Sequence, residues 1–281
     1  MPRLFIFGLG YTARFVAARF AARGWEVIST GAEGTLAFDD AGSVRVALAD
    51  ADHVLSSVPP GNAGRGEPLD PVLDLYGDAL GGKPLSYLSS TGVYGDTGGA
   101  WVDESAPVGI GRRTARTEAD TAWLARGARV YRLPGIYGPD RSMLERLAEG
   151  RAHRIDLPGQ VFSRVHVADI AAGVLAGVGA PGGAYNLADD LPCPQNLLVE
   201  EACRLTGLPL PPLQSLDEAG LSPMARGFYA ENRRVANGKA RALLGWRPRY
   251  PTYVEGLRAL SATARPTVAS AAPPAASSDQ R

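Results

Sequence analysis

Short apolar runs alternate with helical patterns along the first half of the chain. The apolar run 4–7 stops at Gly8, and the segment 12–23 repeats large apolar side chains at helical spacing before Gly24. This order predicts a strand, a turn and a helix. Further strands are predicted at 25–28, 35–38, 53–58, 85–89 and 128–133, and helices at 71–80 and 113–125.

This alternation of strands and helices predicts an α/β fold. Parallel strands joined by helical crossovers form a sheet with helices on both faces, and each crossover is right-handed. We therefore expect a Rossmann-type doubly wound parallel sheet over residues 1–135.

The second half of the chain has shorter and more mixed elements. Helices are expected at 141–149 and 168–177, and a strand at 161–165. Because doubly wound folds place ligands at the carboxyl edge of the sheet, residues 136–261 are expected to form a small C-terminal α/β substrate lobe, with chain crossings back to the core. The Ala/Pro/Ser-rich segment 262–281 is predicted to be disordered.

Composition restricts the class of protein further. The chain has 281 residues, enough for one large domain or a large domain with a small one, and 29 basic residues balance 29 acidic ones. No net charge favours nucleic acid or an anionic membrane, so a small-molecule partner is expected. No apolar run approaches the ~20 residues that cross a bilayer, and Cys193 and Cys203 form no CxxC motif. With no signal peptide before the first strand, the sequence predicts a reduced cytoplasmic protein.

A glycine-rich turn joins the first predicted strand to the first helix. The pattern G-x-G-x-x-A is found there as Gly8-Leu9-Gly10-Tyr11-Thr12-Ala13. Gly8 permits a tight turn, Gly10 lets the backbone approach a pyrophosphate, and Ala13 allows close packing of helix on strand. The exposed N–H groups and the dipole of the helix N-terminus attract the anion. The pattern predicts a dinucleotide site, with a purely structural turn as the alternative.

The sequence beside this turn bears on the choice between NAD and NADP. The second strand ends in Ser29-Thr30-Gly31, without a carboxylate to hold the ribose 2′-OH, which slightly favours NADP. Glu33 is close enough in sequence to serve NAD, and Arg14 is the nearest arginine for a 2′-phosphate. Both cofactors stay open.

Four segments occur in an order that is typical of one superfamily. They are the glycine turn at 8–13, Ser89-Ser90-Thr91-Gly92-Val93-Tyr94-Gly95, Arg132-Leu133-Pro134-Gly135-Ile136-Tyr137-Gly138-Pro139 and Arg164-Val165-His166-Val167-Ala168-Asp169. With these segments the chain resembles the extended and atypical short-chain dehydrogenase/reductase superfamily, in its NAD-dependent epimerase/dehydratase-like branch. The resemblance covers residues 3–260.

Two features make the chain more similar to the atypical members. The first turn lacks the G-x-x-G-x-x-G of the extended type, and Ser57-Val58-Pro59-Pro60-Gly61 follows the fourth predicted strand. The segment 1–60 alone is also similar to β-hydroxyacid dehydrogenases, which use a lysine on a downstream helix. The only two lysines here are Lys83, before a strand, and Lys239, in the terminal lobe, so the later motifs favour the short-chain superfamily.

The resemblance also implies catalytic positions. Ser90 falls in the place of the serine that polarises a substrate carbonyl, with a backbone-bonding hydroxyl as the structural alternative. The places of the superfamily's proton-donating tyrosine and its lysine fall on Arg112 and Arg116. Arginine stays protonated, so Arg112 cannot act as the acid, although Arg116 could bind ribose or phosphate. Tyr94 and Tyr137 remain as phenols that could substitute as the acid, with packing of the loops that line the site as the structural alternative for each.

Binding residues follow from the same resemblance. The expected cofactor-binding residues are Gly8, Leu9, Gly10, Tyr11, Thr12, Thr30, Ser57, Val58, Pro59, Pro60, Arg116, Pro134, Gly135 and Ile136. Tyr137, Arg164 and His166 are the substrate-binding candidates, with packing of Tyr137 and a backbone hydrogen bond of His166 as alternatives. His53 and His153 lack neighbours at metal-ligand spacing, so no metal is inferred.

The sequence supports two alternative predictions of function. The first is an NAD(P)-dependent oxidoreductase or epimerase/dehydratase-like enzyme that acts on a nucleotide-sugar or another polar metabolite. The second is a non-catalytic NAD(P)-binding sensor or scaffold. Loss of the Tyr/Lys dyad favours the second, whereas Ser90, Tyr94 and a full substrate lobe favour the first. A homodimer through the helix after Pro107 is a further implication of the resemblance.

Overall fold

The computed structural model describes residues 1–62, 68–109 and 114–264. Its centre is a six-stranded sheet in which all neighbours are parallel, with the spatial order β12-β8-β6-β3-β1-β2. The strands are β1 (Arg3–Phe7), β2 (Glu26–Ser29), β3 (His53–Ser56), β6 (Leu85–Ser90), β8 (Arg129–Leu133) and β12 (Gly183–Asn186). The doubly wound parallel sheet predicted from the sequence is therefore confirmed, and five of its strands lie where the apolar runs predicted them.

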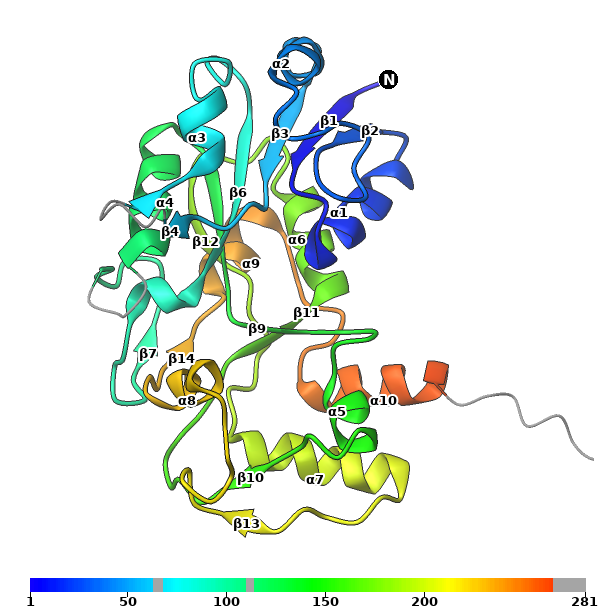
Figure 1. Ribbon diagram of the computed structural model, residues 1–281, viewed down its shortest axis with the longest axis vertical. Helices are drawn as coiled ribbons and strands as arrows, with labels where there is room; N and C mark the ends of the chain where they lie inside the picture. The colour runs from blue at the N-terminus through cyan, green and yellow to red at the C-terminus, as the bar shows by residue number, and fades with distance from the viewer. Residues whose placement is uncertain (63–67, 110–113, 265–281) are drawn as a thin grey trace, which may run out of the picture.

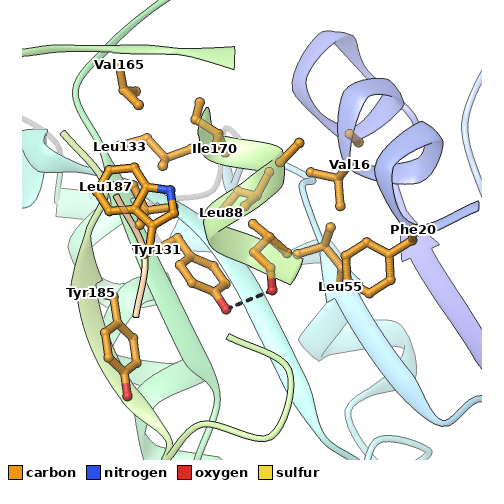
Figure 2. Packing of buried hydrophobic residues seen from close by; sticks show 14 of the residues in the cluster. Val16, Phe20, Leu55, Leu88, Tyr131, Leu133, Val165, Ile170, Tyr185 and Leu187 are labelled. Atoms are coloured by element: carbon orange, nitrogen blue, oxygen red, sulfur yellow. Dashed lines mark hydrogen bonds between the residues drawn. The ribbon is translucent and has the colours of Figure 1, made fainter. Parts of the chain in front are cut away.

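Helices cover both faces of this sheet (Figure 1). One face carries α1 (Tyr11–Ala21), α6 (Val167–Ala176) and α9 (Gly238–Leu244); the other carries α2 (Ala41–Ala49), α3 (Pro71–Tyr76) and α4 (Thr114–Ala125). Each face of the sheet packs against its helices in a separate hydrophobic core, the first under α1, α6 and α9 and the second under α2, α3 and α4. Side chains of β1 alternate between them, because Leu4 and Ile6 enter the first core and Phe5 and Phe7 enter the second. Figure 2 shows the first core, where the Tyr131 hydroxyl donates a hydrogen bond to the Val174 carbonyl.

The predicted strand at 35–38 is wrong. Only Leu36 forms a bridge, with Thr30 at the end of β2. The Thr35 hydroxyl bonds the backbone of Ser29, which holds this segment in a tight turn, and α2 begins soon afterwards at Ala41. The strand predicted at 35–38 is thus present only as the single bridge between Thr30 and Leu36.

The rest of the chain builds a second lobe below the carboxyl edge of the sheet (Figure 1). Its helices are α5 (Met143–Ala148), α7 (Gln195–Thr206), α8 (Pro223–Tyr229) and α10 (Tyr253–Ala264). Short strand pairs join the lobe and its surroundings: β9 (Gly135–Tyr137) with β11 (Arg164–His166), β10 (Arg154–Ile155) with β13 (Leu213–Gln214), β7 (Trp101–Val102) with β14 (Arg234–Val235), and β4 (Gly61–Asn62) with β5 (Pro68–Leu69). α5, α7 and α10 share one core. The small C-terminal lobe expected from the sequence is present.

The chain crosses between the lobes more than once. Residues after Tyr137 enter the second lobe, yet α6 and β12 return to the sheet, where β12 pairs with β8. Within the predicted tail, α10 continues to Ala264, and residues 265–281 lie outside the described part of the chain. Among the described helices, none combines the length and apolarity needed to span a bilayer.

Candidate functional site

The glycine turn between β1 and α1 is fixed by two neighbouring loops. Gly8 has φ +81°, and its N–H donates to Thr30 Oγ1 over 3.1 Å. The Leu9 N–H donates to the Thr30 carbonyl over 2.7 Å, and the Ser57 hydroxyl donates to the Gly8 carbonyl over 2.7 Å. Thr30 and Ser57, both predicted cofactor residues, therefore hold the turn in shape.

The two glycines of this turn have different reasons to lack a side chain. A Cβ on Gly8 would lie 3.0 Å from Val58 Cγ2, so the fold itself requires glycine there. A Cβ on Gly10 would meet nothing within 4 Å, and Gly10 has an ordinary φ of −84°. Nothing in the described protein excludes a side chain at Gly10, so the open space beside it is available to a ligand.

The amino end of α1 faces the same open space. Gly10 is the N-cap residue, no side chain caps the helix, and the first turn has no acidic residue. The first N–H groups of a helix have no partner within the helix, and they carry its positive dipole end. This end of α1 is suited to bind a phosphate.

A charged pair lies on the outer side of the turn. The Arg14 guanidinium bonds the Glu33 carboxylate over 2.8 Å, with the side chains 49% and 65% exposed. Gly31 brings the intervening loop against the turn, because a Cβ there would lie 3.0 Å from the Leu9 nitrogen. The two residues that the sequence offered as alternatives for NADP and NAD therefore bind each other.

Two mostly apolar segments line the carboxyl edge on one side of the turn, since β3 and β8 lie on the same side of β1 in the sheet. The segment from Ser57 to Pro60 follows β3, and Pro134, Gly135 and Ile136 follow β8. These residues are half-buried or exposed, in contrast to the strands that precede them. The predicted cofactor residues thus gather at one edge of the sheet, apart from the position of Arg116, which is described below.

Ser90 ends β6 at the same edge. It caps a short 3-10 helix, η1 (Thr91–Tyr94), by accepting the Gly92 N–H over 3.1 Å. This is the backbone bond that the structural alternative predicted. The half-buried hydroxyl proton has no acceptor in the ranges that the structure describes, so it remains available to a ligand.

Tyr94 points away from the open edge. Its side chain is fully buried, its hydroxyl donates to Asn186 Oδ1 over 2.8 Å, and it accepts from Arg132 over 3.1 Å. Burial raises the pKa of Tyr94 against the opposing charge of Arg132. These bonds hold the phenol at η1, and its role as the acid stays a prediction.

A buried ion pair lies beneath η1, and sequence reasoning missed it. Arg132 on β8 donates from Nη2 and Nε to Asp120 on α4 over 2.7 and 3.1 Å, and the Ser89 hydroxyl donates to the same carboxylate over 2.6 Å. Both charged side chains are buried. The only signal in the sequence was Arg132 at the start of an otherwise apolar motif.

Arg116 lies one helical turn before Asp120 on α4. It donates to the Tyr87 hydroxyl over 2.6 Å and to the Leu88 carbonyl over 3.4 Å. Arg116 thus reaches the end of β6 from the helix predicted to carry the dyad. Arg112, in the predicted tyrosine place, lies outside the described residues.

The three substrate-binding candidates are buried near the junction of the lobes. Arg164 donates to the Phe162 and Cys193 carbonyls, and His166 Nδ1 accepts the Ala168 N–H and so caps α6. Tyr137 joins the core of the second lobe. Contact of these residues with a substrate stays a prediction, since here Arg164 and His166 hold backbone groups.

Neither a metal cluster nor a lysine supplies the missing chemistry. No group of three or more His, Cys, Asp or Glu residues suited to a metal occurs in the described ranges. Lys83 donates to the Ala49 and Ala51 carbonyls, and the Lys239 ammonium lies 5.0 Å from the centre of the Tyr185 ring. Neither lysine therefore takes the place of the dyad beside Ser90.

Several known proteins are similar to this chain in sequence or in structure. No family model matches it. A functionally unknown conserved protein from Silicibacter pomeroyi is 39% identical, with a TM-score of 0.81, over 95% of this chain and all of that one. Protein YeeZ of Escherichia coli is 26% identical over 89% of this chain and 97% of its own, and a 3-diazoavenalumate denitrifying reductase of Streptomyces is 29% identical over 46% and 45%.

More distant solved structures share the fold. The human epimerase family protein SDR39U1, solved with NADPH, has a TM-score of 0.73 at 16% identity, over 92% of this chain and 99% of that one. The UDP-glucose 4-epimerase of Thermus thermophilus, solved with NAD, has a TM-score of 0.72 at 19% identity, over 92% and 98%. The chain thus belongs to the family of the Silicibacter pomeroyi protein, and it shares its fold with NAD-dependent epimerase/dehydratase-like proteins.

Proposed function

We propose that this protein binds NADP or NAD at the carboxyl edge of its sheet and uses it to transfer hydride to or from a polar metabolite. The observation that carries this proposal is Gly10, which lacks a side chain although the protein leaves space for one, beside the uncapped end of α1. The fold is shared with proteins solved with NADPH and with NAD, which supports the same ligand class.

Cofactor binding is tested by Gly10→Val. Because a side chain at Gly10 would project into open space, we expect the variant to fold normally and to bind NADPH and NADH at least about tenfold more weakly, as the valine blocks the pyrophosphate. Titration calorimetry and thermal melting measure both effects. The control is Gly81→Val, since Gly81 also has no neighbour within 4 Å and precedes the opposite end of β6. Unchanged dinucleotide affinity in Gly10→Val would contradict the proposal.

Of the two cofactors, we favour NADP. The Arg14–Glu33 pair is exposed, and exposed ion pairs contribute only about 0–1 kcal/mol, so a 2′-phosphate could displace Glu33 from Arg14 at little cost. Arginine's planar fork suits a phosphate. The rest of the second strand's end supplies no carboxylate for a ribose hydroxyl.

Ser90 would polarise the substrate. Its oxygen already accepts the Gly92 N–H, which orients the free O–H for donation to a developing oxyanion. The substrate would be a nucleotide-sugar, as for the Thermus epimerase, or another polar carbonyl or alcohol compound held by the second lobe. The reductase named among the partial relatives supports the oxidoreductase class.

Turnover is tested by Ser90→Ala, with Ser90→Thr as the matched control. We expect the alanine variant to lose hydride transfer about 100-fold, with unchanged NADPH affinity, and the threonine variant to retain much of it because the hydroxyl remains. NADPH oxidation over a panel of carbonyl compounds and nucleotide-sugars measures the rate. Equal rates in wild type and Ser90→Ala would remove Ser90 from the mechanism.

A non-catalytic sensor or scaffold is the second candidate. The observation that favours it is Arg116, which binds the Tyr87 hydroxyl in place of the lysine that would assist a catalytic phenol. Tight NADPH binding without hydride transfer to any compound of the panel would select this function over the enzyme.

A further inference from the structure

A closed path of hydrogen bonds links the chain just before Ser90 to the chain just after it. Before it, the Ser89 hydroxyl donates to Asp120 on α4 over 2.6 Å, and Asp120 accepts from Arg132 on β8 over 2.7 Å. After it, η1 ends at Tyr94, whose hydroxyl accepts from Arg132 Nη1 over 3.1 Å. Both ends of the Ser90 segment are therefore bound to one buried ion pair.

Asn186, the last residue of β12, ties this path to the edge strand of the sheet. Its side-chain oxygen accepts from the Tyr94 hydroxyl over 2.8 Å, and its side-chain nitrogen donates to the Ala236 carbonyl over 3.1 Å. Its backbone N–H donates to Glu104 Oε1 over 2.6 Å. Because Asn186 is fully buried and bonded at both sides of its amide, its oxygen has a fixed direction toward Tyr94.

The hydrogen of the Tyr94 hydroxyl has one direction in this arrangement. A guanidinium only donates, so the phenol oxygen accepts from Arg132 and the hydroxyl hydrogen goes to Asn186. The Arg132 guanidinium also lies over the Tyr94 ring, 5.0 Å from its centre. Burial raises the pKa of Tyr94, so the phenol keeps this hydrogen at neutral pH.

The short helix η1 depends on such an anchor for its shape. It consists of one turn, Thr91–Tyr94, and a single turn fixes several residues for very few hydrogen bonds. Ser90 caps one end by accepting the Gly92 N–H, and the Tyr94 hydroxyl holds the other. Val93 and the Tyr94 ring also pack in a small core, but apolar contacts are not directional, whereas hydrogen bonds fix an orientation.

We infer that Asn186 and Tyr94 are positioning residues for Ser90: they fix the orientation of η1 and with it the direction in which the Ser90 hydroxyl donates to a substrate oxygen. This inference rests on the role proposed above for Ser90. Donation to a developing oxyanion depends on precise placement, and a small displacement of the donor slows a reaction strongly. Both positioning side chains are fully buried, so they act through η1 and not by contact with the substrate.

Two substitutions loosen the anchor and leave Ser90 unchanged. Tyr94→Phe keeps the ring and removes the hydroxyl, and Asn186→Leu removes the acceptor at similar volume. On a compound of the carbonyl and nucleotide-sugar panel that the wild type turns over, each should lower kcat about tenfold and change NADPH affinity by less than about twofold. Tyr185→Phe is the matched control, because this buried tyrosine of β12 donates to the Pro181 carbonyl over 2.8 Å and should keep the wild-type kcat.

The Ser90→Ala background separates positioning from a general loss of stability. If Tyr94 acts through the Ser90 hydroxyl, Tyr94→Phe added to Ser90→Ala should lower kcat by less than about a further twofold, because no hydroxyl is left to orient. A further loss of about tenfold would overturn the inference and assign Tyr94 an independent role, such as the acid. Full turnover in Ser90→Ala contradicts the role of Ser90 itself, whereas a loss there without one in Tyr94→Phe contradicts only this inference.

Amide hydrogen exchange tests the anchor without any need for turnover. The Gly92 N–H is protected by its bond to the Ser90 hydroxyl. In both anchor variants it should exchange at least about fivefold faster relative to the Phe5 N–H of the central strand β1, as measured by NMR, and the control variant should leave this ratio unchanged. Tyr94→Phe alone decides the test if Asn186→Leu does not fold. An unchanged Gly92 ratio in Tyr94→Phe would overturn the inference.

Discussion

At the residue scale, the Arg14–Glu33 pair connects cofactor choice to one exposed contact. Glu33 occupies Arg14 through a 2.8 Å bond, and its charge also repels a phosphate dianion. Both effects reduce, by the small cost of breaking an exposed pair, the advantage that Arg14 gives to NADP, whereas a 2′-hydroxyl would meet neither penalty. The contacts of NADP must therefore offset the free energy that is lost when Arg14 leaves Glu33.

Removal of the Glu33 charge should favour NADP. We expect Glu33→Gln to raise NADPH affinity about three- to tenfold and to change NADH affinity little, because Arg14 becomes free for the phosphate. Calorimetric titration of both cofactors measures the change. Asp39→Asn, an exposed acid after the same loop, controls for net charge. Weaker NADH binding with unchanged NADPH binding would instead assign Glu33 to the ribose of NAD.

Sequence reasoning at this scale succeeded where local pattern determines the role. The tight turn at Gly8 followed from its spacing between a strand and a helix, whereas the role of Gly10 toward a pyrophosphate stays a prediction. The burial of Arg132 and Asp120 did not, because the pairing depends on how α4 lies over β8, which only the packed sheet determines. The same limit applies to the burial of Tyr94, which its motif did not indicate, and its role as an acid stays a prediction.

At the element scale, the Arg132–Asp120 pair joins α4 to β8 beneath η1. All three guanidinium nitrogens of Arg132 are engaged, by Asp120 and by the Tyr94 hydroxyl. A buried ion pair is costly to form, but removal of one partner is costlier because the other charge remains buried. The strand, the helix and the short helix after Ser90 are thus held as one unit.

Removal of the negative charge of Asp120 should destabilise the folded protein. We expect Asp120→Asn to lower the free energy of unfolding by about 3–5 kcal/mol, measured by urea denaturation, since Arg132 keeps its charge. Asp78→Asn is the matched control, because Asp78 forms an exposed pair with Arg45 and should cost less than about 1 kcal/mol. Similar small losses in both variants would show that the buried pair contributes no more than the exposed one.

The positions of most central strands were predictable from the apolar runs in the sequence. Strands β1, β3, β6 and β8 followed directly from them. The strand expected at 35–38 failed because the Thr35 hydroxyl bonds the Ser29 backbone and holds a turn there. Strand β12 was not predicted, since Gly183–Asn186 is too short to stand out without β8 beside it.

At the scale of the whole molecule, buried histidines and buried carboxyls act in opposite directions on how stability depends on pH. Burial lowers the pKa of His53 and His166 to about 4, so between pH 4 and about 6.5 the unfolded chain binds more protons and stability rises with pH. Asp189, with its pKa raised to about 8, acts in the opposite direction up to that pH. Burial also raises the pKa values of Glu104 and Asp169, so these carboxyls act in the same direction as Asp189.

Stability should therefore pass through a maximum between the folded-state pKa of the two histidines, about 4, and that of Asp189, about 8. We expect the free energy of unfolding to fall on either side by about 1.4 kcal/mol per pH unit for each net proton, measured by urea denaturation from pH 4.5 to 8.5. His53→Gln should weaken the acid-side loss, whereas His153→Gln, at a less buried histidine, serves as the control. A steady rise in stability through pH 8.5 would contradict this account.

During translation, strand β12 is synthesised long after its sheet neighbour β8, which affects folding of the growing chain. Strand β8 pairs with β6 on one side, but its partner on the other side is made only after residues 134–182 have passed through the second lobe. Until then the apolar β8, with Val130, Tyr131 and Leu133, has an open edge, which is a template for association with other chains. Ribosome pausing within 134–182 would prolong this exposure, so the speed of translation there should affect how much of the protein escapes aggregation.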